Sequence, residues 1–472
     1  MSLLGLELSD AGILVAGTDS ARLLELDGPD KESPGYAFAE KNQLIVGKAA
    51  EKKAHLFPRL VISHFWDQLN TEPLDHPGPY TQKNHAEIAY AHLARIWENV
   101  KTHGDEIIMA VPGFYHRDQL SLLLGIANDL SMPIRGFIPI ALAASDSPCP
   151  ASALFHLDIH LHRTEIIFLK QGQYLTCEDS ASIAEKGLAY LHREWVETIA
   201  AEFVRTTRFD PLHQAVSEQE LFERLPAVLE QLQKHAAVDF EMTGGSTTYR
   251  ATLPRELFIQ KSEQVILEVN RLINKTLNKH EMRNYPVAIQ LTHRVARLPG
   301  FQEILAERNR AQFIELAPGA TAFGTLKLWN QLAPQESDRG ISFFISRPWQ
   351  GIANSDVAES PNIGQQTRRP THLLYRNLAF PLTEKPLLIG LEVAKNEPSI
   401  PIKGQTAGVS RKHCSVELRG KAVLLKDFST YGTFVDDVRV KESIALQLGQ
   451  IIRVGTPGEK LQLIACLSID ET

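Results

Sequence analysis

The chain has 472 residues, too many for one hydrophobic core, so two or three domains are expected. A hydrophobic content of 43% and a charged content of 22% are typical of soluble globular proteins. The net charge of −7 gives no sign of the basic surface that nucleic acid or an anionic membrane would require. We therefore expect protein partners, with no nucleic-acid partner and no direct membrane insertion.

Residues 1–330 alternate between strand-like and helix-like patterns. Strands are expected at residues 3–8, 12–16, 21–25, 43–46, 106–112, 134–139, 153–157 and 165–169. Helices are expected at residues 85–100, 119–130, 185–206, 218–237 and 254–279. A strand-rich unit therefore occurs twice, with a helical insertion in the second copy, which predicts a mixed α/β fold.

Four segments of this region resemble the actin and heat-shock-chaperone ATPase superfamily, in the order found there. They are Ile107–Gly113 with the helix start that follows it, Phe137–Ala144, Arg297–Phe301 and Pro318–Gly324. The resemblance covers residues 1–330 and implies two ribonuclease-H-like lobes around a nucleotide cleft. The segment after Leu328 is too short for the peptide-binding domain and lid of the chaperones, so an unfolding chaperone is not expected.

The first expected phosphate-binding hairpin departs from that family. Glycine-rich turns there let backbone N–H groups approach the phosphates closely. In this chain Glu7 replaces a metal-orienting Asp, Ser9 replaces a Gly, and Asp10 replaces a phosphate-facing hydroxyl. A carboxylate about 4 Å from a phosphate repels it by roughly 1 to 4 kcal/mol unless a cation intervenes.

The second hairpin departs in the same direction. Asp158 matches the Asp of the family, but His160, Leu161 and His162 replace three successive glycines. We expect these side chains to fill the space that the phosphates would occupy.

Two further motif positions are also altered. Ile138 stands where the family has a Glu that helps to hold the metal-bound water, and His293 and Arg294 replace the Gly-Gly pair under the adenosine. We therefore predict a degenerate lobe pair that has no catalytic residues, does not hydrolyse ATP and needs no cofactor. The alternative is an atypical site that still binds Mg-ATP.

The histidines also allow a metal interpretation. His156, His160 and His162 share one face at strand spacing, with Asp158 among them, so a metal site is one interpretation. The favoured interpretation is that histidine replaces glycine in a decayed phosphate loop and forms local hydrogen bonds, so we predict no metal. Four other histidines are expected at the surface: His64, His103, His116 and His192.

Targeting and redox signals are absent from the sequence. Glu7 and Asp10 interrupt the first apolar stretch, and no window reaches the roughly 18 consecutive apolar residues of a membrane span. The cysteines show neither zinc-binding nor disulfide spacing (Cys149, Cys177, Cys414 and Cys466). These features predict a cytoplasmic protein.

Residues 331–370 are polar and contain Gly and Pro, which is typical of a linker. The apolar segment Ile341–Trp349 is expected to add a strand to a neighbouring domain. A second domain is then expected at residues 371–472.

The C-terminal region shows short, regularly spaced strand patterns. They lie at Leu387–Gly390, Cys414–Leu418, Ala422–Leu425 and Gln450–Gly455, and predict an all-β sandwich. Between them, the motifs at residues 410–413 and 427–434 resemble those of forkhead-associated (FHA) domains. That family carries phosphothreonine-binding residues on the loops at one end of the sandwich.

The resemblance assigns roles residue by residue. Ser410 would contact the phosphate, while Arg411 and Thr430 would hold the peptide and the serine loop. Three residues match structural positions of the family: Gly390, His413 and Gly432.

Two site positions depart from the FHA pattern. Leu391 follows Gly390 where the family has a phosphate-binding Arg, and Tyr431 replaces an Asn. Losing a charge-assisted contact costs roughly 1.5 to 3 kcal/mol. Arg411, Lys412 and Lys395 are the neighbouring cations available to replace it. Phosphothreonine binding and phosphate-independent docking therefore both stay open.

Neither half of the chain shows a catalytic constellation. We predict a non-enzymatic scaffold or adaptor in which the FHA domain docks a partner protein. The alternative is an ATP-binding switch, or an actin-like assembly-platform protein that recruits partners through its FHA domain.

Overall fold

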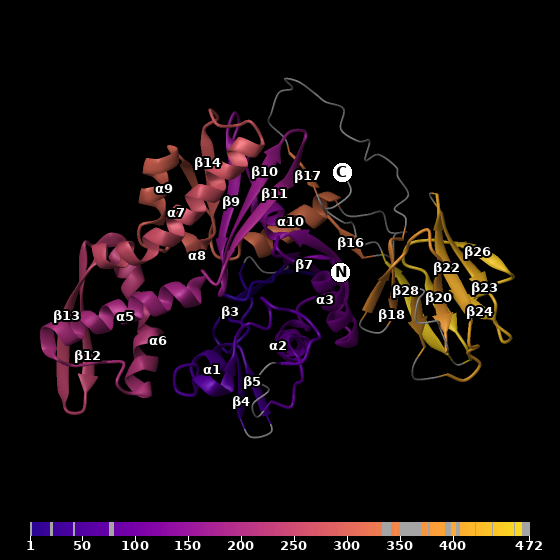
Figure 1. Ribbon diagram of the computed structural model, residues 1–472, viewed down its shortest axis with the longest axis horizontal. Coiled ribbons are helices and arrows are strands. Elements are labelled where there is room, and N and C mark those ends of the chain that lie inside the picture. Colours follow the sequence, from indigo (N-terminus) through magenta and orange to yellow (C-terminus); the bar gives the residue numbers. More distant parts are fainter. Residues whose placement is uncertain are drawn as a thin grey trace.

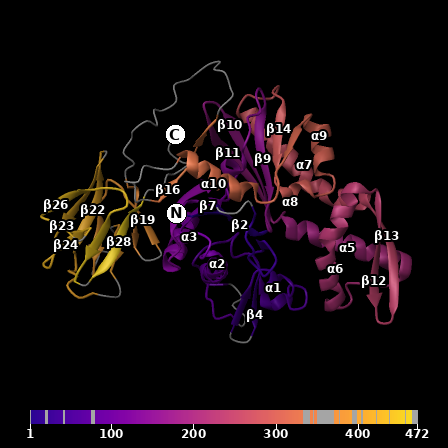
Figure 2. The ribbon, with the colours of Figure 1, turned by 180° about the vertical axis from the view of Figure 1, so that it is seen from behind.

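The computed structural model describes residues 2–18, 22–40, 43–74, 80–332, 341–344, 346–349, 370–375, 378–391, 398–402, 406–420, 422–436, 438–456 and 458–464. Its N-terminal part is a mixed α/β structure with two sheets, and its C-terminal part is a β-sandwich (Figure 1). Seen from behind, the sandwich again lies on the opposite side of the lobes from the hairpin β12–β13 (Figure 2). None of the described helices has the length and hydrophobicity that a membrane span requires.

The first lobe is built around a sheet with the strand order β16-β8-β7-β1-β2-β3. These strands are, in that order, Ser342–Phe343, Ile134–Pro139, Glu106–Val111, Leu3–Glu7, Ile13–Gly17 and Glu32–Ser33. β1 pairs antiparallel with β2 and parallel with β7, which in turn pairs parallel with β8. Helices α2 (His85–Val100) and α3 (Arg117–Asp129) supply much of the core on this sheet.

A smaller sheet completes the first lobe. It has the order β5-β4-β6, formed by Gln43–Val46, Ala37–Glu40 and Val61–Ile62. The short helix α1 (Lys48–Glu51) and the 3₁₀ turn Pro58–Leu60 lie beside it.

The second lobe repeats the pattern of the first. Its sheet has the order β15-β14-β9-β10-β11-β17, formed by Gln312–Glu315, Val287–Leu291, Ala153–Ile159, Arg163–Gln171, Tyr174–Ala184 and Ser346–Pro348. β9 pairs antiparallel with β10 and parallel with β14, and β14 pairs parallel with β15. Both sheets therefore share one plan: an antiparallel three-strand meander followed by two parallel strands.

An insertion extends the second lobe away from the sandwich (Figure 1). The hairpin β12–β13 packs against α5 and α6, and α7 returns the chain to the second sheet. The bounds are Leu188–Thr207 for α5, Ala215–Lys234 for α6, Ala237–Gly244 for β12, Thr247–Pro254 for β13 and Arg255–Lys279 for α7. The short helices α8 (His293–Ala296) and α9 (Phe301–Asn309) follow β14.

Two helices cross between the sheets. They are α4 (Ile140–Ala144), which follows β8, and α10 (Ala320–Leu332), which packs on β1 and β7. A Cβ atom at Gly324 of α10 would lie 1.9 Å from the carbonyl oxygen of Ala143, so only glycine allows this close approach. Apolar residues of both sheets and both helices form a shared core there.

The segment after the described part of α10 joins the two lobes. We call residues 341–344 and 346–349 the strap. Its strand β16 pairs parallel with β8 of the first sheet, and its strand β17 pairs antiparallel with β11 of the second. Arg347 is 5% exposed and donates from Nη1 to the carbonyl oxygen of Leu142 at 3.2 Å. The sequence predicts one strand here, and the structure has two short ones, one in each sheet.

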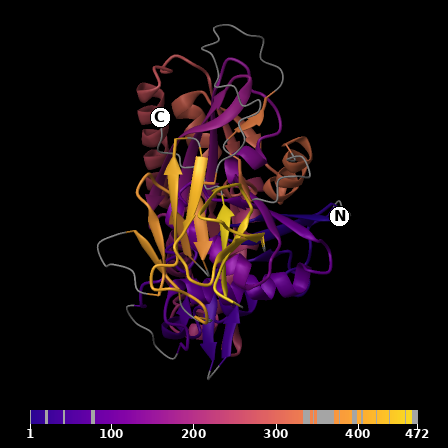
Figure 3. The same cartoon turned by 90° about the vertical axis from the view of Figure 1, so that its right-hand side faces the viewer.

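The C-terminal sandwich packs two sheets face to face around an apolar core. One sheet has the order β19-β18-β28-β27-β24-β25, formed by Leu378–Pro381, His372–Tyr375, Glu459–Ile464, Ile451–Val454, Thr433–Val435 and Val438–Arg439. The other has the order β21-β20-β22-β23-β26, formed by Ser399–Pro401, Leu387–Gly390, Cys414–Arg419, Ala422–Asp427 and Ser443–Leu446. Figure 3 shows these strands in front of the lobes.

The sandwich touches the first lobe through β19 and helix α3. His372 of β18 is 2% exposed, and burial, with the nearby positive charge of Arg117, lowers its pKa to about 4. His372 is therefore neutral at pH 7, as its buried position beside a cation requires.

Several expected elements are wrong or were missed. Described residues 22–25 form no strand, because Leu23 makes only an isolated bridge with Ala16. Helix α5 begins at Leu188, three residues later than expected, because Glu185 adopts a positive φ of 58°. The sequence prediction also missed several strands (β3, β4, β6, β11, β12, β13 and β15). Cys466 and Lys395 lie outside the described residues.

Candidate functional site

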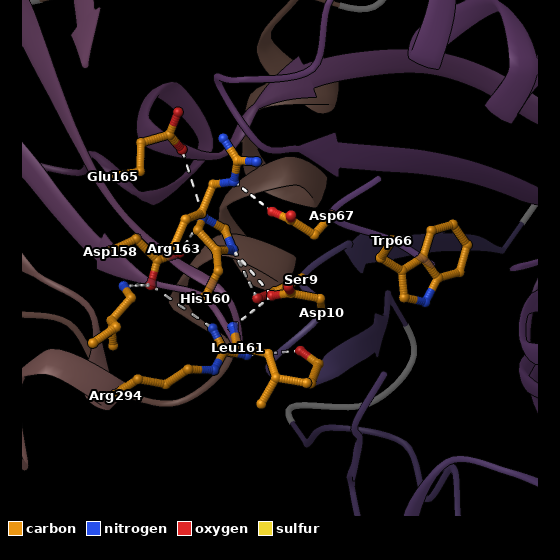
Figure 4. A network of polar contacts seen from close by, with 12 residues as sticks. Ser9, Asp10, Trp66, Asp67, Asp158, His160, Leu161, Arg163, Glu165 and Arg294 are labelled. Atoms are coloured by element: carbon orange, nitrogen blue, oxygen red, sulfur yellow. Dashed lines mark hydrogen bonds and ion pairs between the residues drawn. The ribbon is translucent and has the colours of Figure 1, made fainter. Parts of the chain in front are cut away.

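The turns of two β-hairpins, one from each lobe, are in direct contact (Figure 4). The β1–β2 turn contributes Ser9 and Asp10, and the β9–β10 turn contributes His160 and Leu161. The Ser9 hydroxyl lies 3.1 Å from Nδ1 of His160, and the backbone N–H of Leu161 donates to Oδ1 of Asp10 at 2.7 Å. Side chains therefore occupy the space between the two turns.

His160 is surrounded by carboxylates from both lobes. Its ring nitrogens lie 3.8 Å from Asp10, 3.8 Å from Asp158 and 3.5 Å from Glu165. Burial alone would lower the pKa of His160, but these carboxylates outweigh it and raise the pKa to about 9. At pH 7 the ring is an imidazolium that both hairpins share.

Arg294 of α8 makes a second connection between the lobes. It donates from Nη1 to Glu7 at 3.0 Å and from Nη2 to the carbonyl oxygen of Gly12 at 2.7 Å. It also donates twice to Oε1 of Glu32, at 2.7 and 3.0 Å. All three partners belong to the first lobe, whereas Arg294 belongs to the second.

Asp158 lies between these two cations. Thr292 and the backbone N–H of Ile159 donate to its Oδ1 at 2.7 and 2.8 Å, and Nη1 of Arg294 lies 4.0 Å away. Burial would raise the pKa of Asp158, but His160 and Arg294 lower it to about 2. We call the whole set the interlobe network: Glu7, Ser9, Asp10, Glu32, Asp158, His160, Glu165, Thr292 and Arg294.

Backbone amides near the network are already bonded. The backbone N–H of Leu161 donates to Asp10, that of Ile159 donates to Asp158, and that of Gly113 donates to Glu165 at 3.2 Å. The first amides of α5 donate to the carbonyl oxygens of His160 and Leu161, each at 2.9 Å. A phosphate binds a turn or a helix N-terminus through such amides, so it would have to displace internal carboxylates first.

The structure brings together most of the cleft residues expected from the sequence. Glu7, Ser9, Asp10, Asp158, His160, His293 and Arg294 lie in or beside the network, with His293 at 3.8 Å from Glu32. Ile138 does not, because it is fully buried in the apolar core shared by the lobes.

The histidines of the second hairpin do not converge on one point. His162 turns to the first lobe, where its ring stacks on His64 at 3.5 Å and its Nε2 lies 3.1 Å from the Ser63 hydroxyl. His64 is therefore half-buried, contrary to the surface position expected for it, and His192 is half-buried as well. His156 is buried inside the second sheet at 1% exposure.

One set of side chains has donor types that suit a metal. His64, Asp67 and Glu185 offer ligand atoms within 4.8 Å of one another. Nε of Arg163, however, lies 2.5 Å from Oδ1 of Asp67, so a guanidinium already neutralises this carboxylate. A divalent cation would be repelled by that guanidinium, and we assign no metal there.

A cavity of about 700 Å³ lies between the lobes, next to the strap. Its walls include Phe114, Arg117, Phe137, Ser180 and Phe343. Arg163 and Ile167 of β10 line it, but the residues of the interlobe network do not. Its position is therefore distinct from the place expected for the phosphates.

Sequence reasoning missed several members of the network. Glu32 lies far in the sequence from the motifs described above, whereas Thr292 directly precedes His293 and Arg294. Glu165 is different, because it is directly paired with Asp158 across the β9–β10 hairpin. The hairpin register would have placed these two carboxylates side by side.

The charge on His160 predicts a pH dependence of stability. Its folded pKa of about 9 lies above the ordinary value of 6.5, so its contribution is complete below pH 6.5 and is lost as pH rises through 9. We expect the midpoint of urea unfolding to fall across this window. In His160→Gln the fall should be much smaller, and an unchanged profile would contradict the imidazolium assignment.

At the end of the C-terminal sandwich, Ser410 and Thr430 lie on adjacent loops. The backbone N–H of Thr430 donates to the Ser410 hydroxyl at 3.3 Å, and the backbone N–H of Ser410 donates to Nδ1 of the buried His413 at 3.1 Å. Gly390 is required because a Cβ there would lie 2.1 Å from the carbonyl oxygen of Arg411. These contacts fix the two loops against each other.

The later loop is ordered by its own polar residues. Oδ1 of Asp427 accepts from the Ser429 backbone N–H at 2.9 Å and from the Thr433 hydroxyl at 2.8 Å. Gly432 has a φ of 95°, which favours glycine, and its N–H donates to the Ser429 hydroxyl at 2.8 Å. These bonds fix the conformation of the loop, in which Thr430 and Tyr431 are exposed.

Residues 388–455 match the family model of the FHA domain. The C-terminal sandwich is therefore an FHA domain, with β18, β19 and β28 lying outside the matched range. A domain of this family indicates phosphorylation-dependent interaction with proteins. No curated protein matches the chain. Neither a family model nor a curated relative supports the resemblance between residues 1–330 and the actin and heat-shock-chaperone superfamily.

Proposed function

We propose that the protein is a non-enzymatic cytoplasmic adaptor. In this proposal, the two-lobed region is a nucleotide-free relative of the actin and heat-shock-chaperone ATPases that serves as a binding platform. The FHA domain docks a second protein through a phosphothreonine.

The repeated sheet topology supports the proposed relationship. Each lobe has the same meander and the same two parallel strands, and the helices α4 and α10 cross at Gly324 between them. The segments that resemble the superfamily include this crossing, since Phe137–Ala144 contains α4 and Pro318–Gly324 begins α10. Topology alone does not assign an activity, so the function has to be argued from the site.

The observation that carries the proposal is the interlobe network itself. His160 and Arg294 already compensate the carboxylates, and the nearby amides are bonded to protein oxygens. An ATP-binding switch, the alternative, would need both cations to leave buried partners. Removing one member of a buried charged pair costs about 3 to 5 kcal/mol, which disfavours the switch.

The FHA half of the proposal predicts phosphate-dependent binding through Ser410. We expect a degenerate peptide library centred on phosphothreonine to be retained, and the same library with threonine to be lost. Ser410→Ala should weaken binding of the retained peptides about 10- to 100-fold, because a charge-assisted hydrogen bond is removed. Fluorescence anisotropy with purified full-length protein measures this.

A matched control is Ser443→Ala, which removes an exposed serine hydroxyl from β26 of the same domain. It should bind as the unmodified chain does. Equal retention of the phosphothreonine and threonine libraries would instead show that the FHA domain binds its partner without phosphate.

A further inference from the structure

Exposed apolar side chains gather at the loops that carry Ser410. Leu391, Phe428 and Tyr431 are 37%, 44% and 65% exposed. The backbone N–H of Leu391 donates to the carbonyl oxygen of Ser410 at 3.2 Å, and that of Phe428 donates to the carbonyl oxygen of His413 at 2.9 Å. The backbones of Leu391 and Phe428 therefore lie beside the Ser410–His413 loop, and Tyr431 directly follows Thr430.

Two lysines lie close to the ring of the exposed Phe428. Nζ of Lys412 lies 5.5 Å from the centre of the Phe428 ring, and Nζ of Lys426 lies 5.6 Å from it. At an exposed site the attraction between a cation and an aromatic face is weak. Both ammonium groups therefore lie near the ring and remain accessible to a ligand. We call Lys412, Lys426 and Phe428 the basic–aromatic ridge.

The two lysines of the ridge have no carboxylate partner among the described residues. Within the described parts of the chain, neither Lys412 nor Lys426 forms an ion pair. The neighbouring carboxylate of Asp427 faces the loop instead, where the Ser429 N–H and the Thr433 hydroxyl bond to it. These bonds outweigh burial and lower the pKa of Asp427, so the group is committed to holding the loop.

We propose that this surface selects phosphothreonine peptides with acidic residues beside the phosphothreonine and an apolar side chain to cover Phe428. The inference rests on the proposed reading of phosphothreonine by Ser410. Lys412 and Lys426 supply the positive charge that Leu391 does not, and they attract the flanking carboxylates of the peptide. The apolar side chains around them contribute buried area on binding.

The test compares phosphopeptides that differ only in their flanks. Three peptides share one phosphothreonine and one apolar residue. The residues beside the phosphothreonine are Asp/Glu in the first peptide, Asn/Gln in the second and Lys/Arg in the third. Fluorescence anisotropy at low salt measures the affinity of each peptide for the full chain. We expect the acidic peptide to bind about five- to tenfold more tightly than the neutral one, in line with a pair of exposed charge contacts. Its advantage should shrink as salt screens those contacts.

Substitutions in the basic–aromatic ridge test whether its residues cause the preference for acidic flanks. The double variant Lys412→Ala/Lys426→Ala should remove the preference for acidic flanks, whereas Lys441→Ala/Lys460→Ala, which removes two exposed lysines elsewhere in the domain, should retain it. Phe428→Ala should weaken all three phosphopeptides. Lys412→Glu/Lys426→Glu should shift the preference to basic flanks, which a merely unfolded domain would not do.

Two results would overturn the inference in different ways. Equal affinity for acidic and neutral phosphopeptides, with phosphate still required, would refute the ridge and leave the Ser410 assignment intact. A preference for acidic flanks that is equally strong without phosphate would refute the reading of phosphothreonine, and with it the inference as stated.

Discussion

Arg294→Met is expected to destabilise the two-lobed region by about 3 to 5 kcal/mol, because it leaves buried carboxylates without their cation. Glu7 is 2% exposed and Asp158 is 1% exposed, so water cannot replace the guanidinium. Arg294→Lys should recover only part of the loss, since one ammonium cannot reach both Glu7 and Gly12 with the geometry of a guanidinium.

Urea denaturation followed by tryptophan fluorescence measures this effect selectively. The tryptophans lie at positions 66, 97, 195, 329 and 349, so none lies in the FHA domain. The control is Arg250→Met, which breaks ion pairs with Asp239 and Glu241 in which the arginine side chain is 63% exposed. It should cost less than about 1 kcal/mol. Similar losses in both variants would show that Arg294 is not a buried interlobe connection.

Gly324→Val is expected to destabilise the same region by about 3 kcal/mol or more, because no space exists for the added carbons. The first of them would lie 1.9 Å from the carbonyl oxygen of Ala143, which is backbone and cannot rotate away. Helix propensity acts in the opposite direction, since valine is more favourable than glycine in a helix by a few tenths of a kcal/mol. Steric overlap therefore decides the sign.

Gly172→Val is the matched control for this variant. A Cβ at Gly172 would meet only the carbonyl oxygen of Tyr174, at an ordinary 3.7 Å. Its unfolding midpoint should stay close to that of the unmodified chain. If Gly324→Val also kept that midpoint, the close crossing of α4 and α10 would be wrong.

The parts of the fold that sequence reasoning predicted best are those with strong periodicity. Helix α2 begins and ends as expected, because its buried positions Ile88, Leu93, Ile96 and Val100 repeat at helical spacing. Asn84 precedes this helix and caps it by accepting from the Glu87 backbone N–H at 2.9 Å.

The missed strands have two different causes. In β12, Val238, Phe240 and Met242 are buried and alternate with exposed residues, so this strand has a period-two pattern that is visible in the sequence. In β11, polar and small residues dominate, and most positions are exposed or half-buried. Its pairing with β10 determines that strand, and a pairing partner is not visible in local sequence.

The same distinction applies to the interlobe network. Ser9, Asp10 and His160 were predictable because they stand in hairpin turns that the resemblance singled out. Glu32 reaches the network only through tertiary structure, because it lies 262 positions from its partner Arg294. Thr292 stands next to His293 in the sequence, but its hydrogen bond to Asp158 is not visible in local sequence. Phe428 lies within the motif at residues 427–434, but its significance depends on the two lysines near its ring, which only the structure shows.

The central claim is that protein side chains have replaced the nucleotide between the lobes. Isothermal titration calorimetry of the full chain with Mg-ATP, repeated with Mg-ADP, tests it most directly. We expect no saturable heat up to millimolar nucleotide, which corresponds to binding weaker than about −4 kcal/mol. Saturable one-to-one binding with a micromolar Kd, lost in a variant of the hairpin turns such as Asp158→Ala, would contradict the claim.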